Sequence, residues 1–479
     1  MLRRAVPLLA AGTLLLAACA GGPSPRSTAS RAAAPSAGVV ATPSATPAPV
    51  KSPPSNQADA PTGDWTTYHR DNARTGNART GNDSTAVRPD RLTVAWSVKL
   101  DGAVYGQPLV VGEAILAATE SDTIYALDAA SGRVRWQQHV GEPVRRSTLP
   151  CGNIDPLGIT GTMVYDPASQ LVFAVAEVAG PHHDLVGIDV TTGQVRVRRG
   201  IDPPTDNPKV LQQRAALALS SGRVYVAYGG LYGDCGDYHG WVLASATDGQ
   251  GPMLSYRVPT TREGGIWAPS GPAVDTAGNL YVAVGNGEST KTYDGSESVV
   301  KLSADLAKLD LFAPASWAQE NATDTDLGST GPALLPDGLV FIAGKSGTGY
   351  VLRADRLGGI GGAAASAPVC TSFGGTALLD RTLFVPCRDG VRSVTIGPDG
   401  GIAVGWHAAA SVDGSPVVGA GVVWAIDTRG GVLHALDPAT GRSIATQQVG
   451  AVPHFASPTL TAGQVLIGTM DGVVAIGAG

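Results

Sequence analysis

The stretch Tyr105–Trp136, YGQPLVVGEAILAATESDTIYALDAASGRVRW, decides the fold. Four short apolar runs lie in it at residues 109–111, 114–118, 124–127 and 134–136, and Gly, Asp and Ser separate them. Short β-branched and aromatic runs between turn residues predict strands joined by tight hairpins. Because four such strands cannot bury both faces of their sheet alone, the unit needs neighbouring copies of itself.

The beginning of this unit recurs along the chain as a small residue or a proline followed by an apolar run. Eight occurrences lie at residues 107–110, 161–164, 215–217, 271–274, 331–334, 375–378, 415–418 and 457–460. Their spacing of roughly 40 to 60 residues is typical of propeller blades. An Asp followed four residues later by a Gly also recurs, at residues 128–132, 189–193 and 437–441. Because Asp can bond to its own backbone and Gly adopts the left-handed conformation, this pair fixes the hairpin before the last strand of a blade.

The two ends of the repeat array complement each other. Residues 92–100 form a lone strand before the first full unit, whereas the last unit, residues 454–476, supplies only three strands. Pairing the lone strand with the last unit would close the ring and remove the exposed sheet edges. We therefore predict an all-β fold, an eight-bladed β-propeller of four-stranded antiparallel blades whose last blade is closed by the N-terminal strand. A seven-bladed ring is the alternative, if residues 215–217 do not begin a blade.

The first 62 residues differ in composition from the repeats. Residues 1–4 are basic and residues 5–17 are apolar but too few to span a bilayer, which predicts a signal peptide at 1–18. Its end, Leu16-Ala17-Ala18-Cys19, resembles the lipobox of bacterial lipoproteins, which implies lipidation of Cys19. Residues 19–62 are rich in Ala, Pro and Ser, so we expect a disordered tether before a propeller at 63–479. An ordinary secretory signal and a Pro-rich docking motif are the alternatives for these two segments.

Four cysteines follow Cys19, and an even number in an exported domain predicts two disulfides. In a propeller, the loop that leads into a blade and the end of that blade's second strand lie on the same side of the disc. Cys370 and Cys387 occupy these places in the sixth blade, and Cys151 and Cys235 lie on that side too. We therefore predict the pairs Cys370–Cys387 and Cys151–Cys235. Metal binding by these cysteines is not expected, because CxxC spacing is absent from the sequence.

Three segments resemble the pyrroloquinoline-quinone (PQQ) enzyme repeat family. They are WTTYHRDNARTG at residues 65–76, LTVAW at 92–96, and the pattern Ala-x-Asp-(x)3-Gly-(x)3-Trp that ends at Trp136. In that family the last Trp docks between blades, although its position holds Val197 in the second blade and Ala445 in the seventh. The organisation is also similar to that of BamB-like assembly lipoproteins, which implies an exported propeller that binds a partner.

The dehydrogenases of that family carry a vicinal Cys-Cys disulfide over the quinone, a Trp beneath it, carboxylates and an Asn on calcium, and an Asp base. This sequence has neither a Cys-Cys pair nor the C-x-x-C-H motif that attaches haem. Trp267 is a candidate stacking residue, but packing between blades is favoured for it. The Glu, Asn and Asp residues of loop 320–326 are candidate calcium donors, but a solvated turn is favoured there. His182-His183 is likewise expected in an exposed loop. We therefore expect no cofactor, with PQQ and calcium as the alternative.

Residues just before the inner strands line the channel mouth of a propeller, and they form the candidate ligand-binding site. These residues are Tyr105, Arg214, Trp267, His454 and Phe455. Aromatic groups, an Arg and a His that converge on one opening could hold a peptide or a small ligand, although simple packing of the mouth is favoured for each of them. No other catalytic constellation is evident, since the sequence contains neither G-x-S-x-G nor H-E-x-x-H.

Charge and composition restrict the partners. The formal net charge is −6 and no cluster of Lys and Arg occurs, so no nucleic acid is expected to bind. The sequence predicts a monomeric, non-enzymatic scaffold, lipid-anchored on the outer side of the cell membrane or on the periplasmic face of an outer membrane. Its expected partner is a protein or a peptide. A PQQ-dependent dehydrogenase and a binder of cell-envelope carbohydrate are the alternatives.

Overall fold

Residues 63–78, 89–409, 411–461 and 463–478 are described by the structure, which is a computed structural model. All of them lie in the compact unit Pro54–Gly479. The signal peptide and the tether predicted at residues 1–62, with the lipidation site Cys19, lie outside the described residues.

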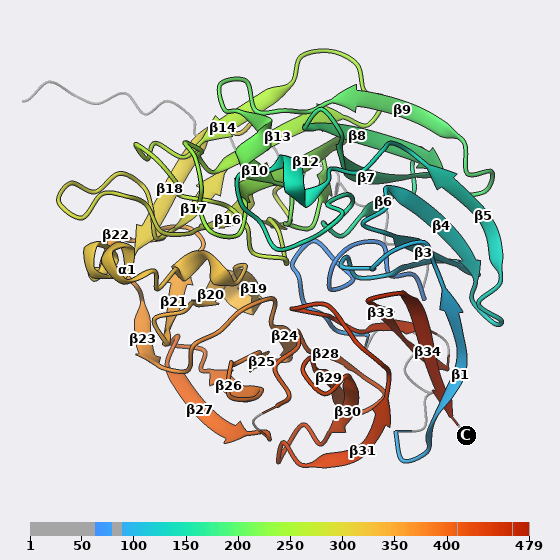
Figure 1. The fold of residues 1–479 in the computed structure, drawn as a ribbon. Helices are drawn as coiled ribbons and strands as arrows, with labels where there is room; N and C mark the ends of the chain where they lie inside the picture. Colours follow the sequence, from blue (N-terminus) through green and yellow to red (C-terminus); the bar gives the residue numbers. More distant parts are fainter. Residues whose placement is uncertain (1–62, 79–88, 410, 462, 479) are drawn as a thin grey trace, which may run out of the picture. The chain divides into compact units, whose positions relative to one another are not determined.

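Eight antiparallel sheets, the blades, surround a central axis (Figure 1). From the inner to the outer strand, blades 1–4 consist of β2 (Leu109–Val111), β3 (Ala114–Ala118), β4 (Thr123–Asp128) and β5 (Val134–His139); β6 (Val164–Asp166), β7 (Leu171–Val178), β8 (His182–Asp189) and β9 (Val195–Gly200); β11 (Ala218–Ser220), β12 (Arg223–Gly230), β13 (Trp241–Ala246) and β14 (Leu254–Arg257); and β15 (Ala273–Val274), β16 (Leu280–Val284), β17 (Ser298–Leu302) and β18 (Lys308–Ala313). Blades 5–8 consist of β19 (Ala333–Leu335), β20 (Leu339–Ala343), β21 (Thr348–Arg353) and β23 (Ala365–Pro368); β24 (Ala377–Leu379), β25 (Thr382–Val385), β26 (Arg392–Ile396) and β27 (Ile402–His407); β28 (Val417–Gly419), β29 (Val422–Asp427), β30 (Val432–Leu436) and β31 (Ser443–Gln448); and β32 (Thr459–Thr461), β33 (Gln464–Thr469), β34 (Gly472–Ala478) and β1 (Leu92–Lys99). The eight-bladed prediction is confirmed, and the start of blade 3 at β11 excludes the seven-bladed alternative.

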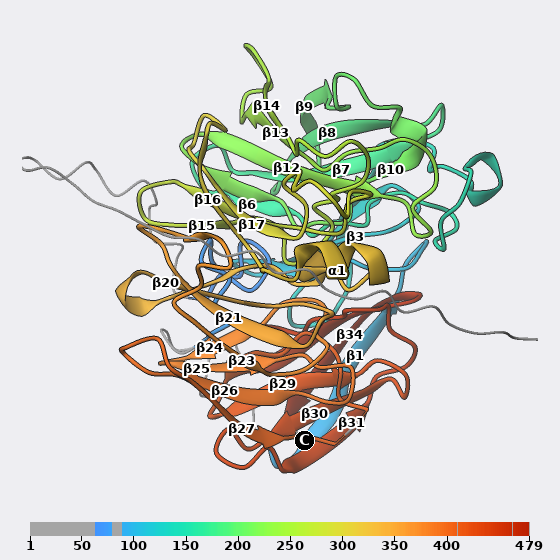
Figure 2. The same cartoon turned by 90° about the vertical axis from the view of Figure 1, so that its left-hand side faces the viewer.

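A few elements lie outside this repeat. β10 (Leu211–Gln212) pairs with β12, and β22 (Gly359–Ile360) runs parallel to β18. The helix α1 (Trp317–Thr323) follows β18, and short 3₁₀ turns span Arg146–Thr148, Pro208–Val210, Leu327–Ser329 and Pro336–Gly338. In the side view of Figure 2, α1 lies between the green and yellow blades 2–4 and the orange and red blades 5–7.

The ring is closed inside blade 8 by strands from both ends of the propeller. β1 pairs antiparallel with β34, from Leu92 opposite Ala478 to Lys99 opposite Gly472. Figure 1 shows the blue β1 beside the dark red β34. Because this pairing covers the last sheet edge, the predicted closure is confirmed.

Neighbouring blades are joined by Trp side chains that lie on glycine turns, here called Trp latches. Trp136 of β5 covers Gly193 in the β8–β9 turn of blade 2, where a Cβ would come within 2.8 Å of the indole. Its Nε1 donates to Val190 O at 2.9 Å. Two further latches have the same arrangement: Trp96 on Gly132, and Trp406 on Gly441. The docking between blades that the family resemblance implied for this Trp is therefore present.

Residues 64–78, here called the plug segment, lie against the inner strands of the ring. The segment bonds to every blade, through contacts to Val110, Tyr165, Leu219, Val274, Leu334, Leu378, Val418 and Ser457. Its buried side chains include Tyr68, His69 and Arg74. Since the plug bonds to the inner strands and the channel-mouth residues precede those strands, the plug closes the channel beneath the mouth.

Two disulfides fasten loops of this propeller. Cys151 pairs with Cys235 at a Cα–Cα distance of 6.1 Å, and Cys370 pairs with Cys387 at 5.7 Å. These are the two pairs that the repeat pattern predicted. In the part of the chain that the structure describes, no helix has the length and apolar character needed to cross a membrane.

Candidate active site

The structure brings the five predicted channel-mouth residues together. The Arg214 guanidinium lies 5.8 Å from the centre of the Tyr105 ring and 5.6 Å from that of Phe455, and it donates to His454 O at 3.2 Å. Trp267 and Phe455 have ring centres 6.4 Å apart. Arg214 is buried, which lowers its pKa. The mouth thus combines a buried cation with a cluster of aromatic rings.

Trp267 belongs to this cluster and does not form a Trp latch. Its Nε1 donates to Asp326 Oδ2 at 3.2 Å. Two glycines make room for the indole: a Cβ at Gly229 would lie 2.8 Å from the Trp267 Cβ, and one at Gly285 would lie 3.2 Å from Nε1. Because these glycines belong to blades 3 and 4, the packing between blades that was favoured for Trp267 is compatible with its place at the mouth. Its ring is seated in a glycine cradle at the channel mouth.

Asp326 is the carboxylate at the centre of the site, and its side chain is only 3% exposed. Lys345 Nζ lies 3.0 Å from its Oδ2, and the backbone N–H of Asn286 donates to Oδ1 at 3.3 Å. The same ammonium lies 2.8 Å from Asp324 and 5.7 Å from the Trp267 ring centre. Burial raises the pKa of Asp326, and the neighbouring Lys345 opposes that rise. The carboxylate and the ammonium group thus lie in contact in a largely buried place.

A second carboxylate lies beyond Asn286. The Asn286 Nδ2 lies 3.5 Å from Glu263 Oε2, and Glu263 is buried beside Arg262. Burial raises the pKa of Glu263, with Arg262 opposing it. Asn286 thus links the two carboxylates, through its backbone N–H to Asp326 and through its side-chain amide to Glu263. In the described residues, no group of three or more His, Cys, Asp or Glu side chains is arranged to hold a metal. Asp326 and Glu263 are only two acidic side chains.

Loop 320–326 is not the solvated turn that its polar sequence favoured. Its first residues belong to α1, and both Glu320 and Asp326 are buried, while Asp324 stays exposed. Asn321 fastens the loop, since it accepts from Gly287 N at 2.9 Å and donates to Ser296 Oγ at 2.9 Å. Glu320 is thus buried on the inner face of α1 and Asp326 is buried after the helix ends, which polar composition alone does not reveal.

A buried acid supports the loop from behind. Glu297 Oε2 accepts from the backbone N–H of Leu327, the residue after Asp326, at 2.6 Å. Burial, together with the nearby Asp326, raises the pKa of Glu297 to about 9. Glu297 therefore stays protonated at neutral pH and adds no second negative charge behind Asp326.

The histidine pair is also placed differently from the prediction. β8 begins at His182, so His183 is strand rather than exposed loop, and it is 1% exposed. Its Nδ1 lies 2.8 Å from Asp202 Oδ1 and its Nε2 lies 3.7 Å from Glu177 Oε1. This pair belongs to the packing of blade 2.

Sequence reasoning missed Asn286, Lys345 and Glu263. A signal was present for two of them: Asn286 lies two residues after β16 and Lys345 lies two residues after β20, which is the same place in successive blades. Second strands of a propeller end at the mouth, so polar residues at their ends converge there. Glu263 lies in an irregular loop between blades, and no repeat position marks it.

Comparisons with known proteins support the repeat family. A family model described as "Outer membrane protein assembly factor BamB" matches residues 78–250. The polyvinylalcohol dehydrogenase of Sphingopyxis sp. (strain 113P3) is 27% identical over 240 residues, which cover 45% of this chain and 34% of that protein. A polyvinylalcohol dehydrogenase of Pseudomonas sp. is 24% identical over 252 residues, which cover 47% and 36% respectively. The chain spans about a third of the length of these curated relatives.

Solved structures with this fold include enzymes and an assembly factor. Quinohemoprotein alcohol dehydrogenase ADHIIG from Pseudomonas putida HK5 has a TM-score of 0.68 at 16% identity, covering 87% of this chain and 80% of that one. A europium-containing methanol dehydrogenase has a TM-score of 0.68 at 14% identity, covering 87% and 98%. BamB from Moraxella catarrhalis has a TM-score of 0.56 at 16% identity, covering 81% and 100%. At these identities the likeness shows the fold alone.

The expectation that the chain has no cofactor is wrong. Both curated relatives are named dehydrogenases, and the structural neighbours include quinohemoprotein alcohol dehydrogenases and a europium-containing one. These matches point to PQQ and a metal. The predicted resemblance to the PQQ enzyme repeat family is confirmed.

Proposed function

We propose that this chain is a quinone-dependent oxidoreductase that oxidises alcohols at the channel mouth. The observation that carries the proposal is the contact of Trp267 with Asp326, flanked by Asn286 and Lys345. The resemblance implied a stacking Trp, an Asn and carboxylates for calcium, and an Asp base. All these residue types meet here, although they come from three separate loops of blades 4 and 5.

The residues fit PQQ and a hard cation in most respects. Gly229 and Gly285 carry no side chain, and a Cβ on either of them would crowd Trp267. The indole therefore has space at this place, and its face could stack on a planar cofactor. Oxygens of Glu263 and Asn286 are of the kind that Ca²⁺ prefers, and Asp326 is kept as the base. Two family features are absent from the sequence, the vicinal disulfide and the haem-attachment motif. At the mouth, this chain has the Arg214 guanidinium in contact with the Phe455 ring.

The side chains of this site have separable tasks. The chemistry supplied by bound PQQ with a divalent cation is two-electron oxidation of an alcohol carbon, with the cation polarising a quinone oxygen. Asp326 accepts the hydroxyl proton at a carboxylate oxygen. Trp267 Nε1 orients that carboxylate through its hydrogen bond, and Lys345 favours its ionised form. The plug segment keeps the other end of the channel closed to water.

The test is calorimetric titration of the purified protein with PQQ and Ca²⁺, followed by alcohol oxidation with an artificial electron acceptor. We expect saturable binding that Trp267→Ala weakens. Asp326→Asn should keep cofactor binding but lower kcat by about 10²–10⁴-fold, because it removes a general base. Asp324→Asn is the matched control, since this exposed carboxylate also contacts Lys345 yet does not contact Trp267. Absence of both binding and oxidation with simple and polymeric alcohols would rule the proposal out.

A second candidate is an assembly scaffold of the BamB kind. It is favoured by the family model, which matches residues 78–250 and so covers blades 1 and 2 and the first three strands of blade 3. Crosslinking in intact cells distinguishes the two functions. A scaffold would retain a protein partner, and Asp326→Asn would not change that partner, whereas the same substitution would abolish oxidation in an enzyme.

We also propose that the protein is exported and anchored as a monomer by a lipid on Cys19. The lipobox-like end of the signal and the two disulfides in the propeller support export. Labelling of cells with a fatty acid should mark the wild-type protein and not Cys19→Ser. The variant should move from the membrane fraction to the soluble one. Labelling that persists in Cys19→Ser would contradict the anchor.

A further inference from the structure

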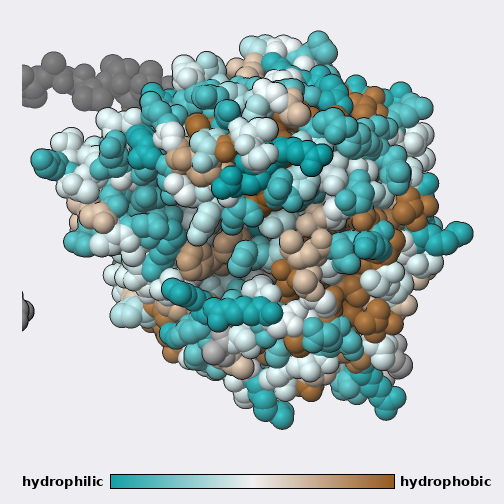
Figure 3. Space-filling model, viewed as in Figure 1, coloured by the Kyte–Doolittle hydropathy of each residue, from teal (hydrophilic) through white to brown (hydrophobic). Residues whose placement is uncertain are grey.

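A cavity of about 220 Å³ opens beside the candidate active site, on the other side of Phe455. Phe373, Arg388, Asp413, Arg429, His454 and Phe455 line it. Figure 3 shows the hollowed middle of this face, with brown apolar side chains inside and hydrophilic ones around them. We propose that this cavity binds the carboxylate of a ring-bearing organic anion. The proposal that this cavity binds an anion is independent of the proposed function. Only the identification of that anion as PQQ rests on it.

Two arginines give the cavity its positive charge. Arg388 and Arg429 are both exposed, and within the described residues neither side chain has an ion-pair partner. They follow the second strands β25 and β29 of adjacent blades, so the two loops present them to one cavity. A guanidinium offers a planar fork of donors that matches a carboxylate. Two such groups therefore favour an anionic ligand.

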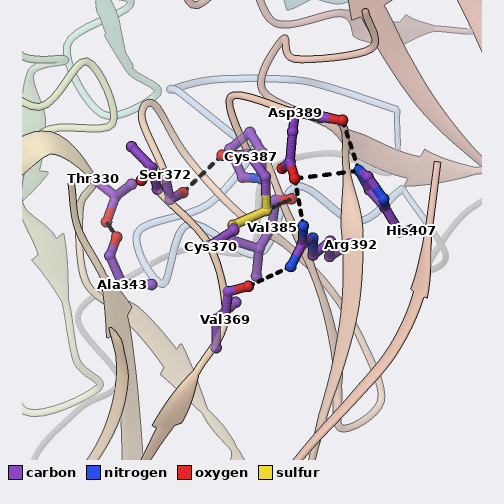
Figure 4. The surroundings of a disulfide bond; sticks show 12 residues. Thr330, Ala343, Val369, Cys370, Ser372, Val385, Cys387, Asp389, Arg392 and His407 are labelled. Atoms are coloured by element: carbon purple, nitrogen blue, oxygen red, sulfur yellow. Dashed lines mark hydrogen bonds and ion pairs between the residues drawn. A yellow bond between two sulfur atoms is a disulfide. The ribbon is translucent and has the colours of Figure 1, made fainter. Parts of the chain in front are cut away.

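The acidic neighbours are already engaged elsewhere. Asp389 pairs with Arg392 and lies 3.8 Å from His407 Nε2, and Figure 4 shows its carboxylate between these two side chains. Asp413 accepts two hydrogen bonds from Thr428 at Oδ1. Asp427 accepts the backbone N–H groups of Arg429 and Gly430. Only Asp413 lines the cavity, so its arginines outnumber its carboxylates.

The apolar wall of the cavity suits a ring. Phe373 and Phe455 are stacked, with ring centres 6.0 Å apart and planes 18° from parallel. Phe455 has a φ of 67°, in the left-handed region that an aromatic residue seldom adopts. Such strain persists where the surroundings hold it, often at functional sites. A ligand ring can pack on this wall while its carboxylate reaches the arginines.

The loop that carries Arg388 is held rigidly. Cys387 is disulfide-bonded to Cys370, and the Arg388 N–H donates to Thr371 O at 2.9 Å. Ser372 Oγ donates to Pro386 O at 2.8 Å, as Figure 4 shows beside the yellow disulfide. A backbone that is fixed before the ligand arrives loses little entropy on binding. The disulfide and these bonds therefore hold the backbone that carries the exposed Arg388 side chain.

Two sources could supply this anion. PQQ is itself a planar ring system that bears carboxylates, and Phe455 lies between the cavity and Trp267. The other source is a substrate or effector with a carboxylate on a ring. Both share one chemistry, which a small aromatic dicarboxylate reproduces.

The experiment is calorimetric titration of the full-length protein with benzene-1,3-dicarboxylate. We expect saturable binding that Arg388→Gln and Arg429→Gln each weaken at least about tenfold, because each removes a charge-assisted hydrogen bond. Arg442→Gln is the matched control, an exposed arginine in the β30–β31 hairpin of blade 7 that does not line the cavity, and it should bind like wild type. The neutral benzene-1,3-dicarboxamide should not bind. No binding by wild type, or equal affinity in all four proteins, would overturn the proposal.

A second arm identifies the source. If PQQ with Ca²⁺ displaces the dicarboxylate, the cavity holds the cofactor's own carboxylate, and if both bind together, it is a separate subsite. The outcomes for the two proposals are distinguishable. Dicarboxylate binding that depends on the arginines, without any PQQ binding, would keep this pocket and reject the quinone function. PQQ binding that none of these variants affects, without dicarboxylate binding, would do the reverse.

Discussion

Two buried histidines, His69 and His183, have pKa values that their surroundings move in opposite directions. Burial lowers the pKa of His69 to about 3, and its Nδ1 and Nε2 bond to neutral groups, Thr376 O and Ser457 Oγ. Burial also acts to lower the pKa of His183, but the carboxylates of Asp202 and Glu177 outweigh it and raise that pKa to about 9. Neighbouring charge, rather than depth of burial, decides whether the pKa of a buried histidine is raised or lowered.

These shifts predict opposite effects of pH on stability. His69 has a folded pKa below its ordinary 6.5, so its contribution is full above about pH 6.5 and is lost as the pH falls towards about 3. His183 has a raised folded pKa, so its contribution is full below about pH 6.5 and is lost as the pH rises through about 9. Each shift corresponds to a few kcal/mol, since one pKa unit is about 1.4 kcal/mol.

The measurement is the free energy of unfolding by urea at a series of pH values. His69→Gln should flatten the acid side of the profile and leave the alkaline side unchanged, while His183→Gln should do the converse. An acid side as steep in His69→Gln as in wild type would contradict the assignment.

The residue types of the candidate active site could be recognised in the sequence, but their burial could not, because burial depends on the surrounding fold. Trp267 and the acids of loop 320–326 were visible as candidates, because their residue types match a quinone site. Their burial was not visible, since it depends on α1 and on the salt bridge of Asp326 with Lys345. Asn286 and Lys345 are marked in the sequence only by their shared place two residues after the second strand of a blade. Only the ring geometry brings the ends of β16 and β20 to one place.

At the scale of single elements, the Trp latch couples a β-strand to the turn of the next blade. Gly193 has a φ of 73°, and a Cβ there would lie 2.8 Å from Trp136. Glycine is thus needed at this turn for two reasons, the left-handed backbone and the indole above it. In blade 2 the Trp position holds Val197, which lies over Gly249 in the same way with a smaller side chain.

A pair of glycine substitutions separates these two reasons. Gly222 also has a positive φ, 69°, but nothing lies within 4 Å of a Cβ placed there. Gly222→Ala should therefore cost only the backbone strain, about 1 kcal/mol. Gly193→Ala should cost about 1–3 kcal/mol more, because it also displaces Trp136. Denaturant unfolding of both variants measures the difference, and equal losses would show that the latch contributes nothing.

At the scale of the whole molecule, the sequence repeat made the fold predictable, and the way the ring closes was predicted from the two ends of the repeat array. The strand spacing predicted the eight blades, and the lone N-terminal strand together with the three-stranded last unit predicted their closure, as the β1–β34 pairing confirms. Residues 65–76 of the plug segment were visible in the sequence only as a stretch that resembles the repeat family. The contacts of the plug segment with the eight blades come from scattered backbone bonds and from the Asn72 and His69 side chains, which leave no repeat in the sequence.

The closing strand should be the weakest place in the ring. β27 is joined to its partner β26 by a short hairpin, so a detached β27 stays close and pairs again readily. β1 and β34 are separated in sequence by almost the whole propeller, so no hairpin joins them. After β1, the backbone bonds that hold the described chain beside blade 8 are only those of Leu100 and Val104 to Asp471 and Thr469. Trp96 on β1 and Trp406 on β27 make the same latch, to Ala129 O at 3.2 Å and to Pro438 O at 2.8 Å.

Trp96→Ala and Trp406→Ala therefore form a matched pair with different expected outcomes. Each should destabilise the protein by about 3–5 kcal/mol, as loss of a large packed side chain does. Hydrogen exchange should also accelerate about tenfold or more in β34 of Trp96→Ala, because local opening there releases β1 from the ring. In Trp406→Ala, β26 should lose less protection, because its hairpin keeps β27 beside it. Equal loss of protection in the two variants would mean that closure by β1 is no weaker than a hairpin, and that the plug segment, which touches every blade, carries the closure instead.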